Sequence, residues 1–66
     1  MIIRILGHAN AQALFDYFNG RGVTWAEPTN KKSAWHTIKV NIKTEDYFAT
    51  KFDCIQAFPR ARMSFK

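Results

Sequence analysis

The sequence of 66 residues predicts a small α+β fold in which two helices cover one face of an antiparallel sheet. The stretch from Ser33 to Ile42 alternates polar and apolar residues, which is the period of a half-buried strand. Two other stretches carry apolar residues at helical spacing. The remaining apolar stretches are short and are bounded by residues that favour turns. Each predicted element follows below in chain order.

The first predicted strand covers residues 1–6, and it has apolar side chains on both sides, as a central strand does. Gly7 ends this strand, and His8 or Asn10 can serve as the N-cap of the helix that follows. The segment Asn19-Gly20-Arg21-Gly22 is predicted to end the helix, with Gly20 at the left-handed position after its last turn. The apolar face of the helix is predicted to comprise Ala11, Leu14, Phe15 and Phe18.

A short second strand is predicted over residues 23–26, and a polar turn over residues 27–32 connects it to the long strand over residues 33–42. Because these two strands follow each other directly, we expect them to form a hairpin. In the long strand the predicted inward side chains are His36, Ile38, Val40 and Ile42.

Thr44 is predicted to cap a second helix, with acidic residues in its first turn, where the helix dipole favours negative charge. The predicted inward stripe of this helix is Phe48, Phe52 and Ile55. After Pro59 the tail alternates again, so residues 60–66 are expected to form a last strand. The resulting order β-α-β-β-α-β is that of the ferredoxin-like split βαβ fold, in one compact domain over residues 1–66.

The composition is basic and rich in aromatic residues. The net charge is +5 and aromatic residues make up 15% of the chain, and the isoelectric point is about 9.8. A positive field of this kind favours polyanions or acidic protein surfaces, although it also serves solubility alone. The sequence has no apolar run near the roughly 20 residues of a membrane span, and its single cysteine cannot form an internal disulfide. We therefore predict a cytoplasmic location.

The predicted topology leaves one face of the sheet without a helix, and this face is the candidate binding site. It combines cations, hydrogen-bonding groups and one large ring, which suits single-stranded nucleic acid because cations follow phosphates and rings stack on bases. The predicted nucleic-acid or partner-binding residues are Arg4, Trp35, Thr37, Lys39, Asn41, Arg60, Arg62 and Lys66, with Ser64 on the same face.

RNA-recognition motifs use the same face of the same topology, and the chain resembles them in architecture. The resemblance implies binding of single-stranded nucleic acid across the sheet. Only Trp35 is placed to stack on a base, and the Gly-aromatic signature of that family's third strand is absent. The sequence therefore predicts the binding mode of that family but not membership in it.

A second prediction is a protein-binding modulator or inhibitor of a larger host machine, of the kind found among phage and mobile-element accessory proteins. Its anchors would be aromatic residues, which are enriched at interface hot spots: Tyr17, Trp25, Trp35 and Tyr47. A homodimer that buries the open sheet face is a third possibility.

The residue types of common active sites are present without the spacing that chemistry requires. His8, His36 and Cys54 show no zinc-ligand spacing, and Gly20-Arg21-Gly22 follows a helix instead of a strand, so it does not form a dinucleotide-binding loop. Consecutive acids such as Glu45 and Asp46 on a helix do not face each other, which makes them a poor acid–base pair. The sequence predicts a non-enzymatic protein without catalytic residues, metal or cofactor.

Overall fold

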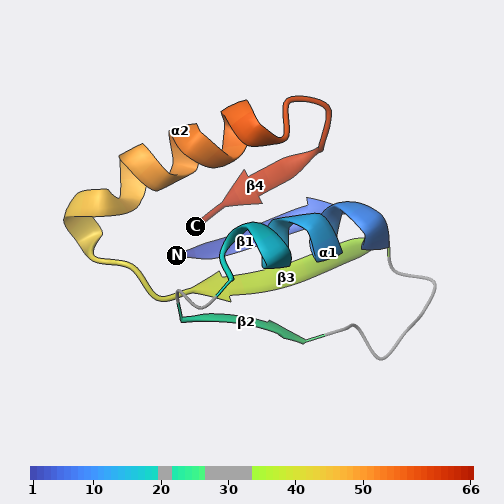
Figure 1. The fold of residues 1–66 in the computed structure, drawn as a ribbon, viewed down its shortest axis with the longest axis horizontal. Helices are drawn as coiled ribbons and strands as arrows, with labels where there is room; N and C mark the ends of the chain where they lie inside the picture. The colour runs from blue at the N-terminus through green and yellow to red at the C-terminus, as the bar shows by residue number, and fades with distance from the viewer. Residues whose placement is uncertain (20–21, 27–33) are drawn as a thin grey trace.

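The computed structural model describes residues 1–19, 22–26 and 34–66. These residues form a four-stranded antiparallel sheet with the strand order β2-β3-β1-β4, together with two helices (Figure 1). The predicted α+β class is confirmed. The elements along the chain are β1 (Ile2–Leu6), α1 (His8–Tyr17), β2 (Val23–Ala26), β3 (Trp35–Val40), a 3₁₀ turn (Thr44–Asp46), α2 (Tyr47–Ala57) and β4 (Met63–Phe65).

Strand β1 lies inside the sheet, between β3 and β4, as its apolar residues on both sides predicted. Ile3 and Ile5 are fully buried, whereas Arg4 between them is exposed. Successive side chains of a strand point to opposite faces, so this pattern separates a core face from an outer face. The same separation continues into β3, where His36, Ile38 and Val40 are buried.

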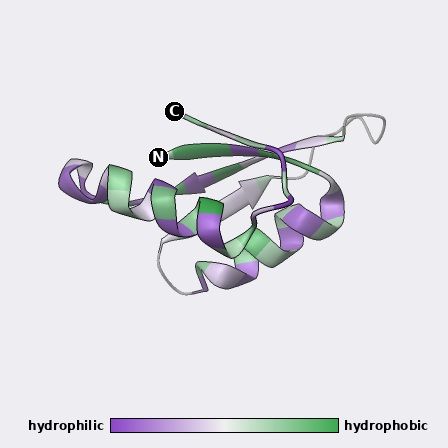
Figure 2. Cartoon of the chain, turned by 90° about the horizontal axis from the view of Figure 1, so that it is seen from above, coloured by the Kyte–Doolittle hydropathy of each residue, from purple (hydrophilic) through white to green (hydrophobic). Residues whose placement is uncertain are grey.

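Both helices lie on the core face of the sheet, and Figure 2 shows them together on that side. Helix α1 contacts β1, β2 and β3, and α2 contributes Cys54 to the same core. The buried apolar core comprises Ile3, Ile5, Ala11, Leu14, Phe18, Ile38, Val40 and Cys54. None of the helices in the described parts of the chain is long and apolar enough to cross a membrane.

The predicted hairpin of β2 and β3 is present, because Val23 pairs with Val40 and Ala26 pairs with Thr37. Strand β3 is shorter than the predicted strand over residues 33–42, since it covers Trp35–Val40. The turn predicted over residues 27–32 and the helix-ending role of Gly20 fall outside the described residues.

The start of α1 differs from the prediction of a side-chain cap. The N-cap residue is Gly7, at φ 94°, and no side chain caps the helix. Asn10 lies inside the helix, where its side-chain amide donates a hydrogen bond back to the Leu6 carbonyl at 3.0 Å. The chain turns sharply from β1 into α1 at a left-handed position that glycine adopts without steric cost, so the helix begins earlier than Asn10.

The start of α2 also differs from the prediction. Thr44 begins a 3₁₀ turn that precedes the helix, and Asp46 is the N-cap residue without a side-chain capping bond. The acidic residues predicted for the first helical turn therefore lie in this 3₁₀ turn.

The inward stripe predicted for α2 is wrong. Phe48 is 78% exposed, Phe52 60% and Ile55 46%. Helix α2 instead turns Cys54 inward, and Phe58 just beyond its end packs against the core. Within α2 only Cys54 is buried, and the half-buried positions include Thr50 and Lys51, so the most apolar side of this helix does not face the sheet. Helical spacing alone therefore does not determine the orientation of the helix.

An aromatic cluster closes the end of the core between α1, β2 and β3. The Trp25 ring lies 5.3 Å from His8, 5.6 Å from His36 and 6.0 Å from Phe15, measured between ring centroids. Trp25 therefore faces inward. In the described part of the chain, the buried Trp25 Nε1 and His36 Nδ1 have no hydrogen-bond partner. His36 is thus a core residue, as its place in the strand predicted.

Candidate nucleic-acid interface

The face of the sheet opposite the helices carries side chains in three rows that cross the strands. Antiparallel pairing places directly opposed residues on the same face, so the register defines each row. The first row is Thr24, Lys39, Ile2 and Lys66; the second is Ala26, Thr37, Arg4 and Ser64; the third is Trp35, Leu6 and Arg62. We call this surface the outer face.

The ends of the last strand are fixed by hydrogen bonds that extend the pairing beyond β4. The Ile2 amide donates to the Lys66 carbonyl at 3.1 Å, and the Lys66 amide donates to the Ile2 carbonyl at 2.9 Å. The Leu6 amide donates to the Arg62 carbonyl at 3.0 Å. These bonds place the side chains of Arg62 and Lys66 on the outer face, although both residues lie just outside the strand.

The outer face is positively charged. Its cations are Arg4, Lys39, Arg62 and Lys66, and all four residues are exposed. No acidic side chain occurs in the three rows of described residues. Because the four cations are spread over three adjacent strands, they present a continuous patch of positive potential instead of a single point charge.

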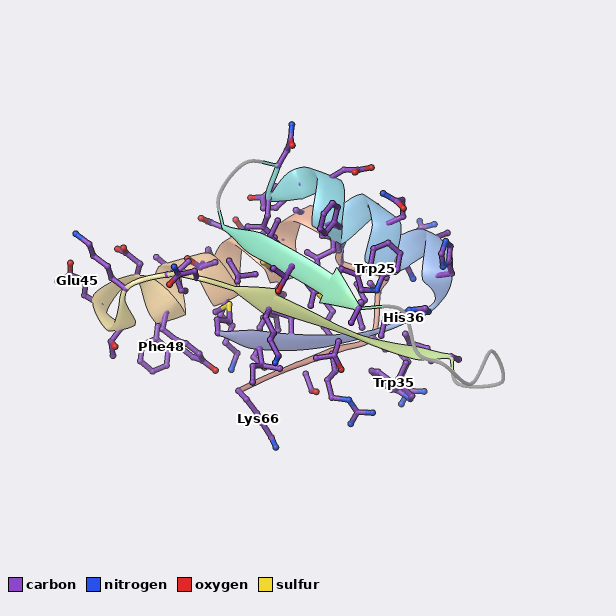
Figure 3. The ribbon with its side chains drawn as sticks, turned by 90° about the horizontal axis from the view of Figure 1, so that it is seen from below. Trp25, Trp35, His36, Glu45, Phe48 and Lys66 are labelled. Atoms are coloured by element: carbon purple, nitrogen blue, oxygen red, sulfur yellow. The ribbon has the colours of Figure 1, made fainter. Side chains whose placement is uncertain are left out.

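One aromatic ring of the outer face is paired with a cation. The Arg4 guanidinium carbon lies 5.4 Å from the centre of the Trp35 ring, within the range of a cation–π contact. Figure 3 shows Trp35 and Lys66 on the side of the sheet turned away from Trp25 and His36. The half-buried Trp35 ring is thus held beside a positive charge at one end of the outer face.

Lys39 lies between two hollows of the surface. One hollow, of about 480 Å³, is lined on the outer face by Ile2, Thr24 and Lys39. The other, of about 370 Å³, is lined by Thr24, Thr37, Lys39 and their neighbours on β2. An ammonium group between two concave, partly apolar surfaces can bind an anion while an attached planar group occupies a hollow.

Six of the eight predicted binding residues come together on the outer face: Arg4, Trp35, Thr37, Lys39, Arg62 and Lys66. Asn41 follows the end of β3, where its backbone N–H donates a hydrogen bond to the Gly22 carbonyl at 3.0 Å, and it borders the larger hollow. Arg60 lies in the exposed turn between α2 and β4 and is not on the sheet. The predicted strand over residues 60–66 is shorter, because the turn after Pro59 extends past Arg60.

Sequence reasoning did not identify Thr24 as part of this surface. Thr24 pairs with Lys39, and Ile2 pairs with Lys39 from the other side. The alternation of residues 23–26, combined with the register of the hairpin, is the signal that could have placed Thr24 there.

Two findings concern the His, Cys, Asp and Glu residues that the sequence analysis considered. No cluster of three or more His, Cys, Asp or Glu side chains that could hold a metal ion occurs in the described part of the chain. Burial, together with the nearby charge of Asp53, raises the pKa of the Cys54 thiol from 9.0 to about 11. Because the thiolate is the nucleophilic form, Cys54 is a poor nucleophile at neutral pH.

The chain is similar to one protein among the curated relatives. It is 35% identical over 49 residues to the uncharacterized protein NMB1437 of Neisseria meningitidis serogroup B, and the match covers 74% of this chain and 21% of that protein. The chain thus corresponds to about a fifth of the length of that relative. No family model and no solved structure matches the chain.

Proposed function

We propose that this protein binds single-stranded nucleic acid through its outer face, without strong sequence preference. The observation that carries the proposal is the grouping of four exposed cations and the Trp35 ring on one sheet face that bears no acid among its described residues. Cations that track a phosphate backbone beside an aromatic ring form the common binding surface for single strands. The predicted cytoplasmic location is part of the same proposal, because nucleic acid is found in that compartment.

We further propose that the fold is the ferredoxin-like split βαβ arrangement. The element order along the chain, the antiparallel strand order β2-β3-β1-β4 and the placement of both helices on one sheet face support this assignment. In such an arrangement the outer face is open over all four strands, which gives an extended strand of nucleic acid a continuous path.

In the proposed complex the cations of the outer face and its aromatic ring have different roles. Arg4, Lys39, Arg62 and Lys66 would neutralise phosphates, and Trp35 would offer its ring to one base. Four phosphate contacts with a single strand correspond to a slope of about −3 in a plot of log affinity against log salt concentration. Thr24 and Thr37 would supply hydrogen bonds that do not depend on the base sequence.

The test measures binding of a fluorescent single-stranded oligonucleotide at low salt, by anisotropy. The double variant Lys39→Glu/Arg62→Glu removes two cations of the outer face, and we expect it to weaken binding by about tenfold or more. The matched control is Lys43→Glu/Arg60→Glu, which makes the same charge change at exposed positions outside the outer face. This control should retain most of the affinity and nearly the full salt slope.

Two results would argue against the proposal. No binding of the oligonucleotide at low salt would exclude it outright. Equal losses in the two double variants would show that net charge alone, and not the outer face, determines binding.

A further inference from the structure

Helix α2 exposes an apolar stripe, formed by Phe48, Phe52 and Ile55, that no described part of the chain covers. Together with Lys51 these side chains line a groove of about 300 Å³. Figure 3 shows Phe48 on the part of α2 that projects away from the Trp25–His36 end of the core. We refer to these three residues as the α2 stripe. An apolar stripe along a helix normally packs against another surface.

We propose that a second copy of this chain binds the α2 stripe, so that two α2 helices pack antiparallel about a twofold axis near Phe52. The inference is independent of the proposed nucleic-acid binding, because it concerns a different surface. The arguments are the spacing of the stripe, its area, the neighbouring strand edge and the distribution of charge.

The spacing of the α2 stripe is self-complementary. When two copies of α2 run antiparallel with the axis near Phe52, each Phe48 lies opposite Ile55 of the other copy, and the two Phe52 rings meet at the centre. A contact of this kind uses the same patch on both subunits, as the common twofold dimers do. Lys51 does not interrupt the stripe, because its ammonium group lies 5.6 Å from the centre of the Phe65 ring on β4.

The exposed area is sufficient for the centre of a small dimer interface. With about 200 Å² for a phenylalanine side chain, the exposed fractions of 78% and 60% leave about 280 Å² of ring surface on each copy. A standard interface buries about 800 Å² per partner, and the centre of a homodimer interface is its most apolar part. The rings would therefore supply about a third of such an interface, with Ile55 and the adjacent polar residues adding to it.

An open strand edge lies beside the α2 stripe. Strand β4 is at the edge of the sheet, and α2 runs alongside it (Figure 1). Because Arg62 and Lys66 direct their carbonyl groups to β1, alternation directs the backbone groups of Met63 and Phe65 to the open side. A twofold axis perpendicular to the sheet relates two such edges in antiparallel orientation, and it relates two α2 helices in the same way.

The distribution of charge favours α2 over the outer face as the contact between copies. Contact through the outer faces would oppose four cations to four cations. Residues 44–59 carry three carboxylates and one ammonium group, a net charge of −2, and the α2 stripe itself is uncharged. An acidic partner would instead be drawn to the outer face, whereas the α2 stripe has no excess of cations that would attract one.

Sedimentation equilibrium of the nuclease-treated protein, from micromolar to millimolar concentration, tests the proposal. We expect the mass to rise with concentration from 7.7 kDa toward twice that value. Phe52→Asp should keep the protein monomeric over the same range. Tyr17→Asp, at an exposed aromatic residue of α1, is the matched control and should leave the dimer intact. Circular dichroism verifies that each variant is folded.

If Phe52→Asp does not fold, Phe48→Gln replaces it, because Phe48 is the more exposed ring and its substitution should still weaken association at least tenfold. A wild-type chain that stays monomeric at millimolar concentration would overturn the proposal. This holds even if a different protein from a lysate is found to bind the α2 stripe. A dimer that persists in both stripe variants would overturn it as well, because its contact would then lie elsewhere.

Discussion

The orientation of α2 is the feature that a stability measurement can test most directly. In the variant Phe48→Ala, the lost side chain is only about one-fifth buried, which is about 40 Å² of a ring of about 200 Å². At roughly 25 cal/mol per Å², the loss is about 1 kcal/mol, and the higher helix propensity of alanine offsets about half of it. We therefore expect the free energy of unfolding to fall by less than about 1 kcal/mol.

The assay is urea unfolding at low micromolar concentration, where association does not contribute. The control is Ile38→Ala, at a fully buried position of β3, which should cost about 2–5 kcal/mol. For a domain of this size the total stability is roughly 3–10 kcal/mol, so Ile38→Ala removes much of it. A loss of 3 kcal/mol or more in Phe48→Ala, with an unchanged slope against urea, would show that this ring lies in the core and that the described orientation of α2 is wrong.

Two further outcomes follow from the described geometry. Burial and the charge of Asp53 raise the pKa of Cys54 to about 11, so the thiol should react with iodoacetamide at pH 8 about a hundredfold more slowly in the folded protein than in urea. Equal rates would show that the thiol is exposed. The stability that this pKa shift contributes is present below pH 9 and should be lost as the pH rises toward 11. Gly22→Ala should lower the free energy of unfolding by about 1–2 kcal/mol, because Gly22 has φ +66° and an added Cβ would meet the Asn41 Cβ at 3.3 Å. Asn at position 22 should cost less, since it tolerates this backbone conformation, and thermal unfolding of the two variants compares them.

The strands and the first helix were predictable because their patterns have a single reading. Alternation around Ile38 and Ile3 determines one core face, and the helical spacing of Ala11 and Leu14 determines one inward side. The alternation of each strand then separates its core-facing residues from its outward ones, which restricts the hairpin register to pairings that keep the apolar residues on one face. The grouping of Arg4, Lys39 and Arg62 on one face could therefore be predicted without coordinates.

The orientation of α2 and the extent of the last strand could not be predicted in the same way. Phe52 lies on the apolar stripe of α2 and Cys54 lies on its more polar side. Which side meets the sheet depends on how the 3₁₀ turn and the segment after Phe58 attach the helix. Arg60 and Arg62 have the same position in the alternating pattern of the tail, but Arg60 belongs to the turn that includes Pro59 and therefore precedes the strand. Such choices depend on contacts between distant segments, which periodicity does not encode.

Among the described residues, the cations of the outer face and the acidic residues of the segment 44–59 are separated, and this separation contributes an electric dipole. A particle with such a dipole rotates in the field of a polyanion before it makes contact, so its encounters are already oriented. On a negatively charged resin or sensor surface, the protein should adsorb with the sheet downward and α2 upward. Immobilisation of this kind leaves the helix accessible to molecules in solution but hides the cationic side from them.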